Sequence, residues 1–209
     1  MASLKNFNLN IEDVLGFAAD TTNVIFGQNN SIVSRIKEAN PNCVFVKCVC
    51  HSVALAVSYA CKELPKNIYQ TVKDVYGYFS HSSKRQKEFS EFQEFVQCDK
   101  HNILRYYEIR WLSLHQCINR ILGQWGALKL YFHDQYILER NITNEFLCKN
   151  FDDEITKLYF LLLDYVLPIV NKFNIIFQAN SCVIHRLYRD MSDMYKSLFT
   201  ELLHEKLLY

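Results

Sequence analysis

A single aspartate, Asp20, follows the first strongly apolar segment of the chain. Residues 14–19 form a short run without charge, which is typical of a strand buried on both faces of an α/β sheet. Ligands and catalytic groups gather beyond the carboxyl ends of such strands. Asp20 is therefore a candidate ligand for Mg²⁺, which prefers several oxygen donors. The alternative is that Asp20 caps the turn formed with Thr21 and Thr22, which is an ordinary role for aspartate.

Three potential metal ligands, Cys48, Cys50 and His51, lie close together at the end of a second apolar segment. Structural zinc sites usually draw two pairs of ligands separated by a loop. The sequence has no CxxC or HxxxH pair to complete such a site, which argues against zinc. The alternative is that the two cysteines are small buried apolar residues and that His51 lies at the start of a helix.

The adjacent residues Arg110 and Trp111 are a third candidate. A planar guanidinium can bind a carboxylate or phosphate through two hydrogen bonds, and a tryptophan ring is a large rigid anchor. A surface salt bridge beside a buried tryptophan would give the same pair. Alone, this dipeptide does not identify a site.

The elements that must position these residues are two strands with a helix between them, followed by a long helical region. Residues 31–39 have helical character that ends at Asn40-Pro41. Residues 52–64 are apolar nearly all round, which predicts a buried helix. Strands are expected at residues 14–19 and 43–50, a strand or extended segment at 103–111, and further helices at 66–81, 84–97, 111–133, 151–178 and 182–209.

The composition is that of a globular protein and not of a strongly basic DNA-binding domain. Half of the 209 residues are hydrophobic and the net charge is +1. Residues 1–125 contain 14 Lys or Arg and 11 Asp or Glu, a net charge of +3, and the remainder contains 9 and 11, a net charge of −2. If the partner is a nucleic acid, most of the electrostatic affinity must come from elsewhere.

The chain is expected in the nucleus or cytoplasm and not in a secreted or membrane-bound form. Its first ten residues, MASLKNFNLN, lack the apolar core of a signal peptide. The longest apolar run, residues 159–170, is shorter than the roughly 18 residues that indicate a membrane span. Eight cysteines without a secretory signal indicate reduced thiols.

Taken together, the segments GFAADTTNV (16–24), KCVCHSVALA (47–56) and IRWL (109–112) resemble three motifs of the hAT superfamily of DNA transposases. In the first motif a strand ends in a catalytic aspartate and an asparagine follows three residues later, which corresponds to Asp20 and Asn23. The second resembles the CxxH motif of the family and the third its RW motif. The resemblance covers about residues 10–135.

The resemblance implies a partial ribonuclease H-like catalytic core in residues 1–110, followed by the start of an α-helical insertion domain in residues 111–209. Asp20 would belong to an acidic triad that binds Mg²⁺ for cleavage and transfer of DNA strands. Cys48 and His51 would support the active site, and Arg110 and Trp111 would pack near it. DNA is the implied partner, without a small-molecule substrate, and the full-length protein could form a homo-oligomer.

The other two carboxylates of the family lie on an upstream strand and after the insertion domain. We therefore expect the chain to be a central fragment, with no catalytic activity alone. The main alternative is a domesticated transposon-derived protein that binds protein or nucleic acid and in which Asp20 is vestigial.

Overall fold

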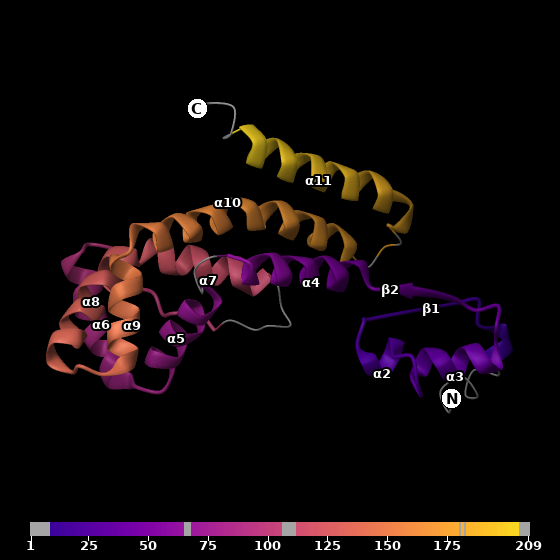
Figure 1. Cartoon of the computed structure of the whole chain (residues 1–209), viewed down its shortest axis with the longest axis horizontal. Coiled ribbons are helices and arrows are strands. Elements are labelled where there is room, and N and C mark those ends of the chain that lie inside the picture. Colours follow the sequence, from indigo (N-terminus) through magenta and orange to yellow (C-terminus); the bar gives the residue numbers. More distant parts are fainter. Residues whose placement is uncertain (1–8, 65–67, 106–111, 180, 182, 205–209) are drawn as a thin grey trace. The chain divides into compact units, whose positions relative to one another are not determined.

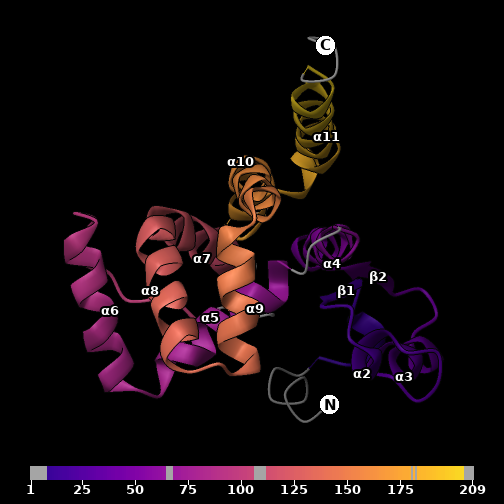
Figure 2. The same ribbon diagram turned by 60° about the vertical axis from the view of Figure 1, so that its left-hand side comes forward.

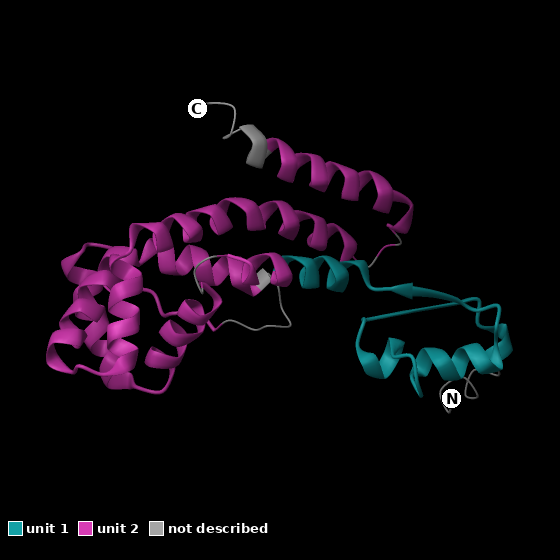
Figure 3. Cartoon of the chain, viewed as in Figure 1, with its two compact units in different colours: residues 1–57 teal, residues 58–209 magenta. Residues whose placement is uncertain are grey.

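The computed structural model describes residues 9–64, 68–105, 112–179, 181 and 183–204. The chain divides into two compact units, residues 1–57 and 58–209 (Figure 3). The boundary near residue 110 between a catalytic core and an insertion domain stays a prediction. In the structure, the helices that begin after residue 67 belong to the second unit because they pack with the later helices.

The first unit is built around two parallel strands (Figure 1). Strand β1 (Gly16–Ala19) pairs with β2 (Val44–Lys47) in a register that sets Gly16 beside Val44 and Ala19 beside Lys47. The connection contains the helices α2 (Asn23–Phe26) and α3 (Ile32–Ala39), and the 3-10 helix η1 (Ile11–Asp13) precedes β1. The prediction of two strands separated by a helix is confirmed.

Both ends of α3 are fixed by side chains that bond to the backbone. The hydroxyl of Ser31 accepts a hydrogen bond from the amide of Ser34 at 3.1 Å, and the hydroxyl of Ser34 accepts one from the amide of Ser31 at 2.9 Å. This reciprocal arrangement satisfies two amides that the first helical turn leaves free. Asn40, at the other end, is buried, and its side-chain amide donates to the carbonyls of Ile11, Glu12 and Val14 at 2.9–3.2 Å.

The expectation that the first strand is buried on both faces is wrong. In a parallel pair, residues in register point to the same face, and Gly16, Ala18, Val44 and Val46 are all exposed. The opposite face contains Phe17 and Phe45, whose rings meet edge to face at 6.4 Å. Helices α2 and α3 lie on one side of the strands in both views (Figures 1 and 2). Among the described residues of the first unit, one apolar face of the sheet is thus left uncovered.

Helix α4 (Val49–Lys62) begins earlier than expected and is less buried. Val49 and Cys50 were assigned to the strand but form its first turn. Within the described length of this helix, Ala54 and Cys61 are buried and lie two turns apart on one side, whereas Leu55 and Tyr59 are exposed. The prediction of a buried helix fails because a single narrow side of the helix is covered.

The second unit is helical. The helices expected at residues 66–81, 84–97, 151–178 and 182–209 are confirmed in their described parts, whereas residues 66–67, 182 and 205–209 lie outside the described residues. The helix expected at residues 111–133 is two helices, because the chain turns at Gln124, and a helix between residues 134 and 150 was not foreseen. The elements are α5 (Ile68–Ser80), α6 (Ser83–Phe95), α7 (Leu112–Gly123), α8 (Trp125–Leu138), α9 (Ile142–Asp152), α10 (Glu154–Phe177), η2 (Ile184–Arg186) and α11 (Leu187–His204).

Aromatic rings fill the core of this unit, where α8 lies between α6 and α9 (Figure 2). Tyr131 and Phe132 of α8 are fully buried and contact rings from three other helices. Phe132 stacks on Phe151 of α9 with centroids 5.5 Å apart, and Tyr131 meets Phe89 of α6 at 5.6 Å. Such contacts contribute about 1 kcal/mol each beyond the burial of apolar area.

Helix α10 is long and apolar enough to cross a membrane by length and composition, and a third of its most apolar window is buried in the protein. Core helices of globular proteins meet the same criterion. Its buried face, with Phe160 and Leu163, packs against α7. The one charge in the apolar run, Asp164, lies 3.1 Å from the imidazole of His115 on α7. This contact explains why a charge interrupts the apolar sequence.

We expect Asn40→Ala to lower the free energy of unfolding of the first unit by about 2 kcal/mol, because three carbonyls in a partly buried position lose their donor. Hydrogen exchange at the amides of β1 and β2 in the native protein measures the effect. Asn42→Ala, at an exposed asparagine two residues later, is the matched control and should change little. Equal exchange in the two variants would contradict this role of Asn40.

Candidate active site

The parallel pairing brings the end of β1 next to the end of β2. The amide of Cys48 donates to the carbonyl of Ala19 at 2.8 Å, which extends the ladder one residue past β2. Asp20 and Cys48 therefore leave the sheet at the same edge, the carboxyl edge at which α/β proteins place their ligands. Two of the three motifs, 28 residues apart in sequence, meet there.

The carboxylate of Asp20 closes the turn that follows β1. Its Oδ1 accepts hydrogen bonds from the amide of Thr22 at 3.2 Å and from the hydroxyl of Thr22 at 2.9 Å. The interpretation of Asp20 as a turn cap is thus confirmed. Asp20 is exposed, and no described residue donates a hydrogen bond to Oδ2. A cap that occupies one oxygen leaves the other available, so the two roles of Asp20 are compatible.

The pKa of the Asp20 carboxyl is lowered from its ordinary value. The hydrogen bond from the hydroxyl of Thr22 is the largest cause and the bond from the Thr22 amide is the second. Both favour the charged form. A smaller coulombic interaction with His51 also lowers the pKa of Asp20, so the CxxH motif lies within electrostatic range of this carboxyl. Asp20 is therefore held as a carboxylate.

Cys48 ends the strand and begins helix α4. Its carbonyl accepts hydrogen bonds from the amide and the hydroxyl of Ser52, both at 3.0 Å. His51 lies in the first turn of this helix and is half-buried. Burial raises the pKa of the Cys50 thiol, and the neighbouring Cys48 raises it further. Metal ligation and nucleophilic attack require the thiolate, so these surroundings disfavour both at Cys50.

The donor groups around Asp20 do not fit a complete two-metal site. Such a site needs several carboxylates that converge on two ions about 4 Å apart. Across the described ranges, no three His, Cys, Asp or Glu side chains are grouped closely enough to hold a metal ion. Asp20 can supply one oxygen ligand to Mg²⁺, and we derive no catalytic step through a metal.

The remaining candidates contribute less to this geometry. Asn23 is exposed and is the first residue of α2. Arg110 and Trp111 lie outside the described residues. The sequence did suggest turn chemistry at Thr21–Asn23, but it did not single out Thr22 as the partner of Asp20. The Asp-x-Thr spacing is the signal that could have identified it, since both residue types bond to the backbone two residues on.

A second CxxH spacing, Cys98 and His101, has a structural role. The thiol of Cys98 lies 3.4 Å from the side-chain oxygen of Gln124. Gln93 donates to this same oxygen at 2.8 Å and to the carbonyl of His101 at 2.9 Å. This network fixes the chain after α6, so the spacing alone does not mark a functional site.

The chain matches no protein-family model and no solved structure. The family resemblance therefore rests on the three sequence motifs. The two motifs within the described residues share one edge of the sheet.

We expect Thr22→Val to raise the pKa of Asp20 towards its ordinary value. The variant loses the hydroxyl hydrogen bond, which lowers this pKa more than the amide bond does. His51→Gln should raise it by less, and high salt should reduce that part of the effect. NMR titration of the Asp20 side-chain carbon measures the pKa. Because the folded-state pKa is depressed, the turn is stabilised above the unfolded-state pKa and loses this stabilisation as the pH falls through the folded-state value.

Thr21→Val is the matched control for Thr22→Val. The hydroxyl of Thr21 has no hydrogen-bond partner among the described residues, so the pKa of Asp20 should not change. A pKa that rises equally in both variants would contradict the assignment of Thr22.

Proposed function

We propose that this chain derives from a hAT-like DNA transposase and contains part of a ribonuclease H-like core, with Asp20 at a catalytic position. The ancestral reaction is Mg²⁺-dependent cleavage and transfer of DNA strands, which implies a nuclear protein. The observation that supports this most is the shared sheet edge of Asp20 and the CxxH residues Cys48 and His51. Sequence order alone did not require the two motifs to meet.

The uncovered sheet also supports a core that is larger than two strands. Parallel sheets are usually buried on both faces and have more strands than β1 and β2. Here one apolar face, formed by Gly16, Ala18, Val44 and Val46, is exposed. A ribonuclease H-like sheet would extend this pair and cover the exposed face.

In this proposal the chain alone does not cleave DNA. Two-metal phosphoryl transfer requires carboxylates that flank both ions, and Asp20 lacks such neighbours among the described residues. Asp20 then supplies one carboxylate oxygen at the edge of the sheet. Thr22 and His51 lower the pKa of this carboxyl and so favour its ionised form. The carbonyl of Cys48 fixes the start of α4 beside Asp20 through two hydrogen bonds from Ser52.

A second candidate function is a domesticated binding scaffold in which the fold persists without catalysis. The bond between Asp20 and Thr22 favours it, because this contact by itself accounts for an aspartate at this position. The two candidates differ in whether Asp20 binds a divalent cation.

We expect Mn²⁺, as a paramagnetic substitute for Mg²⁺, to bind weakly at Asp20 and to broaden the NMR signals of residues 20–22 and 48–51. Asp20→Asn should abolish this broadening, because the ion then loses its charged ligand. Glu12→Gln, which removes an exposed carboxylate before β1, is the matched control and should leave the broadening intact. If the broadening is absent, or is unaffected by Asp20→Asn, Asp20 is not at a catalytic position. The binding scaffold then remains as the candidate function.

We further expect no nicking of supercoiled plasmid DNA by the purified chain in Mg²⁺ or Mn²⁺ beyond a protein-free blank. The reason is that Asp20 belongs to no group of three potential metal ligands among the described residues. Nicking that disappears in the Asp20→Asn variant would show that the chain is active alone and would overturn this part of the proposal.

A further inference from the structure

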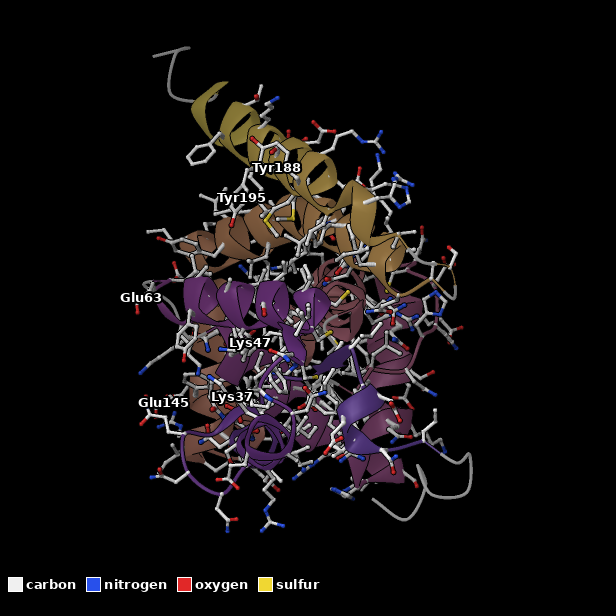
Figure 4. The ribbon with its side chains drawn as sticks, turned by 90° about the vertical axis from the view of Figure 1, so that its right-hand side faces the viewer. Lys37, Lys47, Glu63, Glu145, Tyr188 and Tyr195 are labelled. Carbon is white, nitrogen blue, oxygen red and sulfur yellow. The ribbon has the colours of Figure 1, made fainter. Side chains whose placement is uncertain are left out.

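Helix α11 has a stripe of large apolar side chains that the described residues of the second unit leave exposed. Ile184, just before the helix, is 55% exposed, and Tyr188, Tyr195 and Phe199 are 87%, 51% and 62% exposed. Their spacing of four, seven and four residues places them on one side of a helix. Figure 4 shows Tyr188 and Tyr195 on the same side of α11.

This stripe is distinct from the side of α11 that packs in the unit. Met194 is buried and lies with Phe173 and Ile176 of α10 around one cavity between the two helices. Met191 and Leu198 are half-buried and lie between the packed side and the exposed stripe. The apolar arc of α11 is thus wider than α10 covers. The polar residues Arg189 and Asp193 border the same cavity, and Lys196 is exposed.

The exposed apolar area of the stripe is about what one partner contributes to a small protein–protein interface. A fully exposed large side chain offers about 200 Å², so the four residues together expose roughly 500 Å². This approaches the largest apolar patches on ordinary monomers, which often have a binding role. Two such stripes in contact would bury about 1,000 Å², the lower limit for a specific interface between proteins.

The pattern of the stripe indicates that its partner is another helix. Ile184, Tyr188, Met191, Tyr195 and Leu198 follow one another at intervals of four, three, four and three residues. This is the spacing with which helices interlock along a shared apolar seam. No charged residue lies on the seam, so a partner with a charged face would lose solvation without compensation.

We propose that α11 pairs with α11 of a second copy of this chain, in antiparallel orientation across a two-fold axis. A two-fold interface uses the same patch on both copies, and a second α11 has the same uncharged seam of equal length. Antiparallel packing also sets opposite helix dipoles side by side. The midpoint of residues 184–199 lies between Met191 and Ser192, so Tyr188 of one copy faces Tyr195 of the other.

Sedimentation equilibrium of the full chain at micromolar concentration tests this pairing. The wild-type chain of 24.7 kDa should sediment as a dimer. Tyr188→Glu should weaken dimerisation by about 30-fold or more, as the loss of a central interface residue does. Because Tyr188 is almost fully exposed in the monomer, the helix content measured by circular dichroism should be unchanged.

A rescue experiment tests the orientation. Tyr195→Lys alone should also weaken the dimer, whereas the double variant Tyr188→Glu, Tyr195→Lys should restore it, because antiparallel pairing places each glutamate opposite a lysine. In a parallel pair, like charges would meet and the double variant would stay monomeric. That result would overturn the antiparallel arrangement.

Ile137→Glu is the matched control, since Ile137 on α8 is 65% exposed and lies off the stripe. The control should remain a dimer. A monomeric wild-type chain, or a dimer that survives Tyr188→Glu, overturns the proposal. A further outcome would also overturn it: the wild-type chain floats with anionic lipid vesicles and the Tyr188→Glu variant does not. In that case α11 is an amphipathic membrane-binding helix.

Discussion

The parallel pairing of β1 with β2 is the interaction on which the candidate site depends. Two backbone hydrogen bonds beyond the strand ends, from Val44 to Leu15 and from Cys48 to Ala19, extend the ladder in one register. A slip of one residue would turn every side chain to the other face and would separate Asp20 from Cys48. Four paired residues provide little stability by themselves, so other contacts must hold this register.

Asn40 and the capped helix α3 supply those contacts. Parallel strands need a crossover connection, and the length and ends of α3 determine where β2 begins relative to β1. The side chain of Asn40 ties the end of α3 to three carbonyls that precede β1. The site at the carboxyl edge thus depends on an asparagine at the opposite edge of the sheet, although the two do not touch.

The second unit is stabilised in a different way, by aromatic side chains that span four helices. Its helices contain more apolar residues than this core buries, and much of the surplus is on α10 and α11. Leu158 and Tyr165 on α10 and Tyr188 on α11 are exposed examples. Charge does not explain this surplus, because polar residues occupy other sides of the same helices. Exposed apolar surface of this kind is typical of an interface with another molecule.

The sequence alone determined the order of the elements and the chemistry available to them. The apolar runs around residues 14–19 and 43–50 predicted the strands, Asn40-Pro41 predicted the end of α3, and the long apolar repeats predicted α10 and α11. These signals are local, since they depend on residues within one or two turns of each other. Only the tertiary structure decided which faces are covered, that Gln124 divides a helical stretch, and that Asp20, Cys48 and His51 share one edge. Burial and proximity depend on residues distant in sequence, and a continuous apolar run is the same whether one or both of its faces are packed.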